Sequence, residues 1–261
     1  TVRAGGKWQF RHKQIYTAAM GLEFTHLGWM PIFEEDLREQ LGRYKVLIAE
    51  GVSCVLPETE AILERFVRNG GILIAGLEPM DRDFYCRKRG SRLLNFTLAP
   101  YRGKVERHRL EGGILALPDQ EIGRMDGWKT VMKGGDTPVV IAREFGKGRI
   151  YFHAWQMNDY GIGEFFRRIL ARHGIAPEIE IRKEKRDELS GNIEFHEFSD
   201  GKMTIWYLMN CDRFPKIVRM KSPRLNGTVA QEIFDGRRRL PQQGNEVLAF
   251  LPPARRDRKW R

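Results

Sequence analysis

Six residues with carboxylate, amide or indole side chains come just after stretches that the sequence predicts as strands. They are Trp29, Glu50, Glu78, Trp155, Gln156 and Asp159. Carboxylates accept hydrogen bonds from sugar hydroxyls, aromatic rings pack on the apolar side of a sugar, and ligands of open α/β sheets gather at the carboxyl ends of the strands. This edge is therefore a candidate saccharide-binding wall. The explanation that we favour is structural: the two tryptophans plug the sheet edge and the two glutamates cap helices.

Other reactive side chains are sparse. Cys54, Cys86 and Cys211 are widely separated and odd in number, so they define neither a disulfide framework nor a CxxC metal site. The cytoplasm, a reducing compartment, is the simpler location, and we expect buried or incidental thiols. His153 lies in an apolar run, which is typical of a hydrogen-bonded core histidine. We find no spacing of metal ligands and expect no cofactor.

The sequence Gly146-Lys147-Gly148 looks at first like a phosphate-binding loop. It lacks the upstream glycine and the following Ser or Thr of a P-loop, and it joins the apolar runs 139–145 and 149–155. Strand joined to strand by a glycine-rich turn is the pattern of a β-hairpin. We therefore favour a hairpin turn over a nucleotide site.

The composition is that of a globular protein, and the charge is strongly basic. The 261 residues are 41% hydrophobic and 30% charged, with a net charge of +11, and no run of about 18 apolar residues that could cross a membrane. Basic residues cluster at Arg82, Arg87, Lys88, Arg89 and Arg92, at 237–239 and in the tail 255–261. No RNA-binding aromatic motif or recognition helix accompanies them, so a solvated or inter-subunit surface is favoured over a nucleic-acid groove.

The elements that would position these residues are those of an α/β domain. The continuous apolar runs 45–49 and 72–75 predict buried strands, and a helix opens at Pro57 between them, with Ala61, Ile62, Phe66 and Val67 on one face. This is a βαβ unit. We further predict a strand at 23–28, helices at 33–41 and 162–173, and a short strand near 114–117, with loops over most of 77–138.

The pattern changes after Pro177. Residues 179–190 read as a charged connector, and short strands follow at 192–198, 203–210, 216–220, 229–234 and 246–251, separated by turn residues. The predicted fold is thus an α/β domain (1–183), with an open, mostly parallel sheet flanked by helices in flavodoxin-like layers. A small all-β sandwich domain with a basic tail (184–261) follows it.

Several segments carry a family resemblance. The stretch YKVLIAEGVSCVLPETEAILERFVRNGGILIAGL (44–77), followed by FGKGRIYFHAW (145–155) and ILARHGIAPE (169–178), resembles the glutamine-amidotransferase-like trimerisation domain of family 42 β-galactosidases. The segment YLMN (207–210) and the ending LAFLPP (248–253) are similar to the small C-terminal β domain of the same enzymes. The resemblance covers most of residues 30–251.

In that family the catalytic unit is a TIM barrel that precedes these domains and carries two carboxylic acids. A barrel needs about 250 residues, and retaining hydrolysis needs two carboxyls about 5 Å apart on a rigid scaffold. The resemblance therefore implies a non-catalytic portion of a larger glycoside hydrolase or a free subunit related to one. It also implies a homo-oligomer, a trimer, or a catalytic barrel as partner.

Active amidotransferases carry a cysteine on a sharp turn directly after a strand, with a histidine and a glutamate near by. Here the run ILIAG is followed by Leu77, and neither Cys54 nor Cys86 fits such a turn. The chain is therefore not expected to be catalytic alone. Two functions stay open: assembly and support of a β-galactosidase-like enzyme, including the rim of a neighbouring active site, or a stand-alone module that binds a small carbohydrate or an anionic partner.

Overall fold

The computed structural model describes residues 7–177, 179–183, 193–211, 214–226, 229–231 and 239–252. These form two compact units. The first unit contains the described residues up to Ala18 and Met30–Ile162, and the second contains Ala19–Trp29 and the described residues from Gly163 onward. The chain is a mixed α/β protein with one mixed sheet and several small antiparallel sheets.

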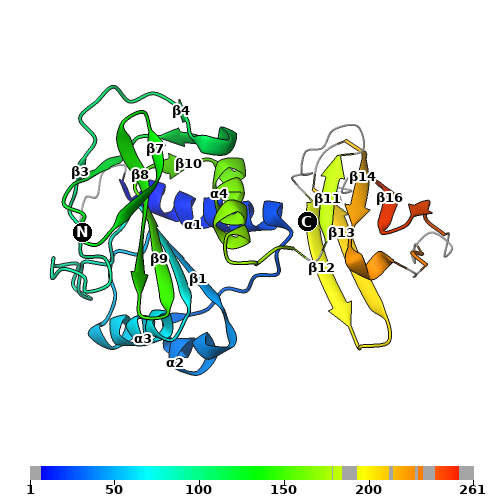
Figure 1. Cartoon of the computed structure of the whole chain (residues 1–261), viewed down its shortest axis with the longest axis horizontal. Coiled ribbons are helices and arrows are strands. Elements are labelled where there is room, and N and C mark those ends of the chain that lie inside the picture. The colour runs from blue at the N-terminus through cyan, green and yellow to red at the C-terminus, as the bar shows by residue number, and fades with distance from the viewer. Residues whose placement is uncertain are drawn as a thin grey trace, which may run out of the picture. The chain divides into compact units, whose positions relative to one another are not determined.

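The first unit is built on a five-stranded sheet with the strand order β1-β2-β9-β8-β7 (Figure 1). Its strands are β1 (Val46–Glu50), β2 (Ile72–Gly76), β7 (Lys129–Gly134), β8 (Thr137–Phe145) and β9 (Gly148–His153). Strands β1, β2 and β9 are parallel, whereas β9, β8 and β7 are antiparallel neighbours. The sheet is therefore mixed rather than mostly parallel, because the predicted hairpin supplies one of its central strands.

The βαβ prediction is confirmed. Helix α3 (Pro57–Arg68) follows β1 and contacts both β2 and β9. The buried hydrophobic residues of α3 are Leu63 and Val67. The apolar face predicted for this helix is correct only at Val67, because Ala61 is exposed and Ile62 and Phe66 are half-buried. All five residues of β2 are buried. Proline at the first turn fits a helix start, where its missing N–H group has no intrahelical partner. A central strand covered on both faces explains the uninterrupted apolar run 72–75. The run 45–49 also predicts a buried strand, but β1 is an edge strand whose first four residues are only half-buried.

The Gly146-Lys147-Gly148 turn joins β8 to β9, as predicted. The backbone N–H of Lys147 donates to the carbonyl oxygen of Arg68 (N···O 3.0 Å), in the last turn of α3. A Cβ atom at Gly148 would lie 2.2 Å from the carbonyl oxygen of Val67. The glycines therefore allow the hairpin to approach the carbonyl end of α3. Because the Lys147 N–H already donates to Arg68, it is not available to bind a phosphate.

The loops predicted over most of 77–138 are confirmed for 77–128, which is mostly irregular, but the prediction is wrong for 129–138, where β7 and the start of β8 lie. The short strands within 77–128 are β3 (Leu98–Pro100), β4 (His108–Arg109), β5 (Leu115–Leu117) and β6 (Gln120–Ile122). Strand β3 pairs with β6, while β5 pairs with β4 and with β10 (Gln156–Met157). The predicted helix at 33–41 is present as α2 (Leu37–Gln40) between the 3₁₀ turns η1 (Glu34–Asp36) and η2 (Leu41–Arg43), and a further 3₁₀ turn, η3, spans Glu111–Gly113.

The strand predicted at 23–28 is wrong, because helix α1 (Lys7–Thr25) extends through its first half and no strand follows. The hydroxyl of Thr25 donates to the carbonyl oxygen of Leu22 (2.6 Å), and His26, with φ of 55°, ends the helix. Helix α4 (Asp159–Ala171) confirms the helix predicted at 162–173. Within the second unit the two helices approach closely, since a Cβ atom at Gly163 would lie 2.6 Å from the carbonyl oxygen of Gly21.

The rest of the second unit consists of short strands. They are β11 (Glu180–Lys183), β12 (Ile193–Ser199), β13 (Thr204–Asn210), β14 (Lys216–Lys221), β15 (Gln242–Gln243) and β16 (Glu246–Leu251), with the 3₁₀ turn η4 (Pro223–Leu225). One antiparallel sheet has the order β11-β14-β16-β15, and β12 pairs with β13. The expected strands at 192–198, 203–210, 216–220 and 246–251 are confirmed. The second half of the strand expected at 229–234, residues 232–234, lies outside the described residues.

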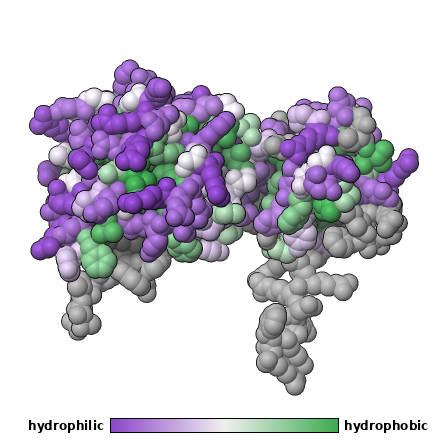
Figure 2. Space-filling view, turned by 90° about the horizontal axis from the view of Figure 1, so that it is seen from below, coloured by the Kyte–Doolittle hydropathy of each residue, from purple (hydrophilic) through white to green (hydrophobic). Residues whose placement is uncertain are grey.

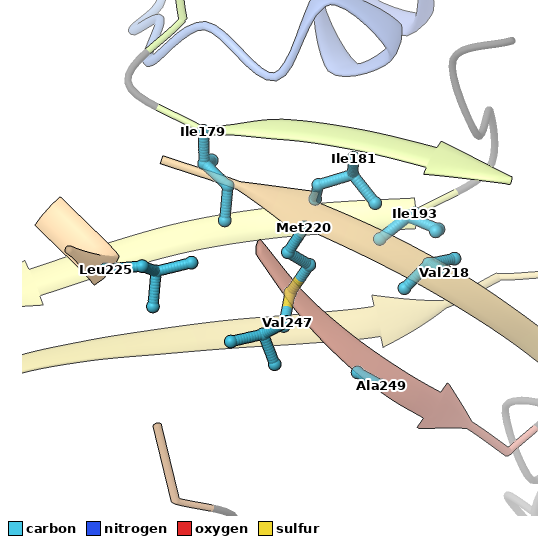
Figure 3. Packing of buried hydrophobic residues seen from close by; sticks show 8 residues of the cluster. All are labelled: Ile179, Ile181, Ile193, Val218, Met220, Leu225, Val247 and Ala249. Atoms are coloured by element: carbon cyan, nitrogen blue, oxygen red, sulfur yellow. The ribbon is translucent and has the colours of Figure 1, made fainter. Parts of the chain in front are cut away.

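These strands enclose one apolar cluster. Figure 3 shows its side chains converging: Ile179, Ile181, Ile193, Val218, Met220, Leu225, Val247 and Ala249. The charged connector predicted at 179–190 is wrong for its described part, 179–183, because β11 pairs with β14 and buries Ile181. Ile179 and Ile181 alternate with Glu180 and Arg182, which is the period-two pattern of a half-buried strand.

Candidate functional site

Glu50 and His153 form a buried pair at the carboxyl edge of the five-stranded sheet. Glu50 ends β1, His153 ends β9, and Gly76 at the end of β2 lies between them in register. The Nε2 atom of His153 lies 2.8 Å from Oε1 and 2.9 Å from Oε2 of Glu50. Both side chains are almost completely shielded from solvent. The pair thus joins two strands that are not neighbours in the sheet.

Gly76 makes this pair possible. A Cβ atom at position 76 would lie 2.0 Å from Nε2 of His153 and 2.3 Å from Oε2 of Glu50. The two side chains therefore meet above the backbone of the middle strand, where glycine alone leaves the space open.

The hydrogen bonds indicate the protonation of the pair. The Nδ1 atom of His153 lies 3.0 Å from the carbonyl oxygen of Trp155, which only accepts, so Nδ1 carries a proton. Burial is the largest influence on the pKa of His153 and lowers it, but the charge and hydrogen bond of Glu50 and the Trp155 carbonyl raise it more. The net effect is a pKa above the ordinary value. We assign an imidazolium–carboxylate pair, so His153 is the hydrogen-bonded core histidine that its apolar context predicts.

Leu77 stands in the turn directly after β2, where an active amidotransferase-like fold would need its nucleophile. Its φ angle is 63° and its side chain is buried. Its backbone N–H donates to the carbonyl oxygen of His153 (2.9 Å), and its own carbonyl accepts from Nε2 of Gln120 (2.6 Å). The left-handed conformation of a residue with a Cβ costs about 1–2 kcal/mol. A sharp, strained turn is present, and it carries an inert side chain.

Trp155 is fully buried rather than displayed at the sheet edge. Its indole N–H donates to the carbonyl oxygen of Gln120 (3.1 Å), and its ring contacts the rings of Tyr101 and His108 at centroid distances of 5.7 and 5.0 Å. A Cβ atom at Gly134 would lie 2.2 Å from the indole. The ring therefore fills a space that leaves no face for a ligand in this conformation.

Three of the candidate residues are partly accessible. Glu78 follows Leu77, Gln156 lies in β10, and Asp159 begins α4. Gln120 connects the residue before Glu78 with the residue before Gln156. Its side-chain amide donates to the carbonyl oxygen of Leu77, and its backbone carbonyl accepts from the indole N–H of Trp155. The exposed Tyr160 lies next to Asp159. These side chains follow the carboxyl ends of two strands of the first unit.

Trp29, the remaining candidate, belongs to the second unit. Its indole N–H donates to Oε1 of Glu23 (2.8 Å), and the residue is exposed. It follows a helix and not a strand, so the argument that placed it at a sheet edge does not apply.

The loops that follow β1 and β2 are joined to each other. The backbone N–H of Val55 donates to the carbonyl oxygen of Arg82 (3.2 Å), and the backbone N–H of Arg82 donates to the carbonyl oxygen of Ser53 (3.1 Å).

Glu60 is a buried carboxylate in the first half of α3. It is 1% exposed and accepts a hydrogen bond from Nη1 of Arg89 (2.7 Å). It also accepts from the Ser91 hydroxyl and the Arg92 backbone N–H. Although burial is the largest influence and raises the pKa of Glu60, these donors lower it below its ordinary value.

Each of the five basic residues of the 81–92 loop lies near a carboxylate, and these five cations share three carboxylates. Arg82 and Lys88 lie within ion-pair distance of Asp81, Arg87 of Asp83, and Arg89 and Arg92 of Glu60. Figure 2 shows hydrophilic side chains over most of one face of the first unit, with hydrophobic ones in small groups. Guanidinium groups already paired with carboxylates are poorly suited to a phosphate backbone, which favours the solvated or inter-subunit surface.

A groove of about 890 Å³ lies at the opposite end of the strands from these residues. It is lined by residues of the 37–45 segment and of α3, with Leu37, Tyr44, Ile62 and Phe66 among them.

The described residues include no group of three or more His, Cys, Asp or Glu side chains placed to hold a metal ion. None of the helices described is long and apolar enough to cross a membrane.

The chain resembles parts of larger glycoside hydrolases. No protein-family model matches it, and no curated protein does. A GH42 β-galactosidase from G. stearothermophilus superposes with a TM-score of 0.69 at 15% identity, over 95% of this chain and 37% of that one. The β-galactosidase from Rahnella sp. R3 gives 0.67 at 15% identity, over 95% and 38%. A GH42 exo-carrageenase from Bacteroides ovatus gives 0.51 at 12% identity, over 92% and 25%.

These comparisons show the fold. The chain therefore has the fold of a part of GH42 enzymes, and it spans less than two fifths of the length of these three structures.

Sequence reasoning missed two features of this edge. The pairing of Glu50 with His153 bridges 103 positions, and no local pattern indicates it, although a glycine ending a buried strand is a signal of close approach. The proximity of Cys54 and Cys86 across 32 positions was likewise not indicated by their spacing.

Proposed function

We propose that this chain is the assembly and support portion of a β-galactosidase-like glycoside hydrolase, and that it does not cleave glycosides by itself. The observation that carries the proposal is the fold: 95% of this chain superposes on 37% of a GH42 β-galactosidase. A chain that matches a minor part of a larger enzyme over nearly its whole length is suited to a supporting role. Its partner is then a catalytic barrel, and it acts within a homotrimer in the cytoplasm.

The first unit is, in this proposal, an amidotransferase-like domain with flavodoxin-like layers that lacks a nucleophile. Leu77 supports this, because it adopts the strained turn after β2 while offering no reactive atom. The second part is a small β sandwich, with the shared cluster of β11, β12, β14 and β16 as its core. We place the boundary between the two domains just before β11 (Glu180–Lys183), a few residues earlier than the 183 that the sequence suggests, because β11 pairs with β14.

The exposed loop after β2 is suited to the rim of a neighbouring active site. Phe84 and Tyr85 are both 73% exposed and contact each other edge to face at 5.6 Å. Exposed aromatic rings are typical of surfaces that meet a partner or a sugar ring.

The oligomeric state and the activity of the purified chain test the proposal. Light scattering after size exclusion is expected to give three times the mass of one chain, and a chromogenic galactoside is expected to stay intact. A monomer would contradict the assembly role, and turnover of the galactoside would contradict the non-catalytic role. Phe84→Ala with Tyr85→Ala serves as a matched variant, expected to leave the mass unchanged.

The alternative is a stand-alone module that binds a small carbohydrate. The partial accessibility of Glu78, Gln156 and Asp159, beside the exposed Tyr160, favours this edge as its site. Calorimetric titration with galactose or lactose tests it. A monomer whose sugar binding is lost in Glu78→Ala and Asp159→Ala supports the module, whereas a trimer that shows no heat of binding contradicts it.

A further inference from the structure

Two cysteines from different loops meet at the carboxyl edge of the first unit. The Sγ atoms of Cys54 and Cys86 lie 3.3 Å apart, and the bond in a disulfide is about 2.05 Å long. Both thiols are free, Cys86 is exposed, and Cys54 is partly exposed. A shift of little more than 1 Å between two side chains would bring the sulfur atoms to bonding distance.

The backbone holds both cysteines in place. Cys54 lies in the bridge between the two loops, flanked by the hydrogen bonds of Ser53 and Val55 with Arg82. The backbone N–H of Cys86 donates to the carbonyl oxygen of Asp83 (2.9 Å), and its carbonyl accepts from Nη1 of Arg82 (3.0 Å). Cys86 has a φ angle of 61°, a conformation that persists only where neighbouring contacts enforce it. The sulfur atoms are therefore positioned by the fold and do not meet by chance rotation of a flexible segment.

We propose that Cys54 and Cys86 form a reversible disulfide by exchange with a low-molecular-weight disulfide of the glutathione type. This is a covalent modification site, separate from the proposed assembly role. The cross-link fastens the loop after β1 to the loop after β2. It thereby fixes the turn that presents Phe84 and Tyr85.

The exchange takes two steps. The exposed Cys86 thiolate attacks one sulfur of the small disulfide, whose S–S bond breaks and releases one thiolate, leaving a mixed disulfide on Cys86. The Cys54 thiolate then attacks Sγ of Cys86, forms the Cys54–Cys86 bond and expels the second small thiolate. Two electrons pass from the protein sulfurs to the small disulfide, and the two protons lost by the cysteines are taken up by the released thiolates.

The order of attack follows from the surroundings of each thiol. Burial and the hydrogen bond with Cys86 raise the pKa of Cys54 above its ordinary value, which lowers its thiolate fraction at neutral pH. Cys86 is the more exposed sulfur and meets the small disulfide first. Cys54 is then the resolving thiol.

Alkylation after equilibration in a glutathione redox buffer tests the proposal on the folded full chain. We expect the reduced protein to take up three alkyl groups and the oxidised protein one, on Cys211, with a non-reducing peptide map that links the Cys54 and Cys86 peptides. The Cys211→Ser variant should take up two alkyl groups when reduced and none when oxidised. Cys54→Ser is expected to trap a glutathione adduct on Cys86.

Thermal unfolding supplies a second measurement. A cross-link across 32 positions should raise the Tm by roughly 5–10 °C, and reductant should reverse the rise. The double variant Cys54→Ser/Cys86→Ser should show no such response. The proposal is overturned if folded Cys211→Ser protein keeps both thiols alkylatable at oxidising poise, or carries two separate glutathione adducts without a linked peptide.

Discussion

The imidazole of His153 and the carboxylate of Glu50 meet directly above Gly76, at an Nε2–Oε1 distance of 2.8 Å. Because both groups are buried, their interaction should be visible in the pH dependence of folding. The pKa of His153 is raised in the folded protein, so the folded state holds this proton more tightly than the unfolded chain does. The stabilisation is fully present below the unfolded pKa of about 6.5 and is lost as the pH rises through the folded value.

We therefore expect the free energy of unfolding, measured with urea, to fall as the pH is raised from about 6.5 into the alkaline range. Glu50→Gln should remove most of this dependence. At neutral pH the same change should lower stability by about 3–5 kcal/mol, because it leaves a buried imidazole without its counter-charge. Lys104→Ala, which breaks an exposed pair with Glu106, is the control, with an expected effect below about 1 kcal/mol. An unchanged pH profile in Glu50→Gln would contradict the assigned ion pair.

Gly76→Ala should destabilise the first unit by at least about 2 kcal/mol. The new methyl group would overlap both Nε2 of His153 and Oε2 of Glu50, and both of these side chains are buried. Gly42→Ala is the matched control, since nothing lies within 4 Å of its Cβ position, and it should change stability by less than about 0.5 kcal/mol. Equal denaturation midpoints for the two variants would contradict this prediction, because they would show that Glu50 and His153 move apart at little cost in stability.

Because Leu77 has a positive φ angle, the usual order of stability, in which an alanine variant is more stable than a glycine variant, should be inverted at this position. At an ordinary helix position glycine is about 1 kcal/mol less stable than alanine, but alanine is strained at a left-handed position and glycine is not. Leu77→Gly is therefore expected to be at least as stable as Leu77→Ala. The same pair of changes at the buried Leu63 of α3 should follow the usual order. Chemical denaturation of the four variants decides, and an order at position 77 that matches position 63 would argue against the strained turn.

Glu60 should hold the 89–92 segment against α3. Its pKa is lowered in the folded protein, so its contribution is present above the unfolded value and is lost as the pH falls through the folded one. Glu60→Gln should flatten the acid limb of the stability profile and should speed tryptic cleavage after Arg89 and Arg92. Glu64→Gln, which affects the exposed pair with Arg68, should change neither by much. Cleavage at the wild-type rate in Glu60→Gln would remove Glu60 from this role.

The amino-acid sequence by itself determined the local framework. Two uninterrupted apolar runs flanking a proline-initiated helix define β1, α3 and β2, and the Gly-Lys-Gly turn between apolar runs defines the β8–β9 hairpin. These elements were predictable because their signals lie within a few residues of one another. The same local logic failed at 23–28, where six residues are too few to tell a strand from the last turns of α1. It also passed over the alternation at 179–182 that marks the start of β11.

Only the tertiary structure decided which side chains meet. The sheet order sets β9 beside β2, so that Glu50 and His153 face each other across Gly76 although 103 positions separate them. The bridge between the two loops likewise sets Cys54 against Cys86. The tertiary structure also encloses the Trp155 ring among rings from the 101–108 region. The sequence alone shows only that Trp155 follows a strand. Strand order and loop pairing depend on contacts between distant segments, and no local pattern of residues encodes those contacts.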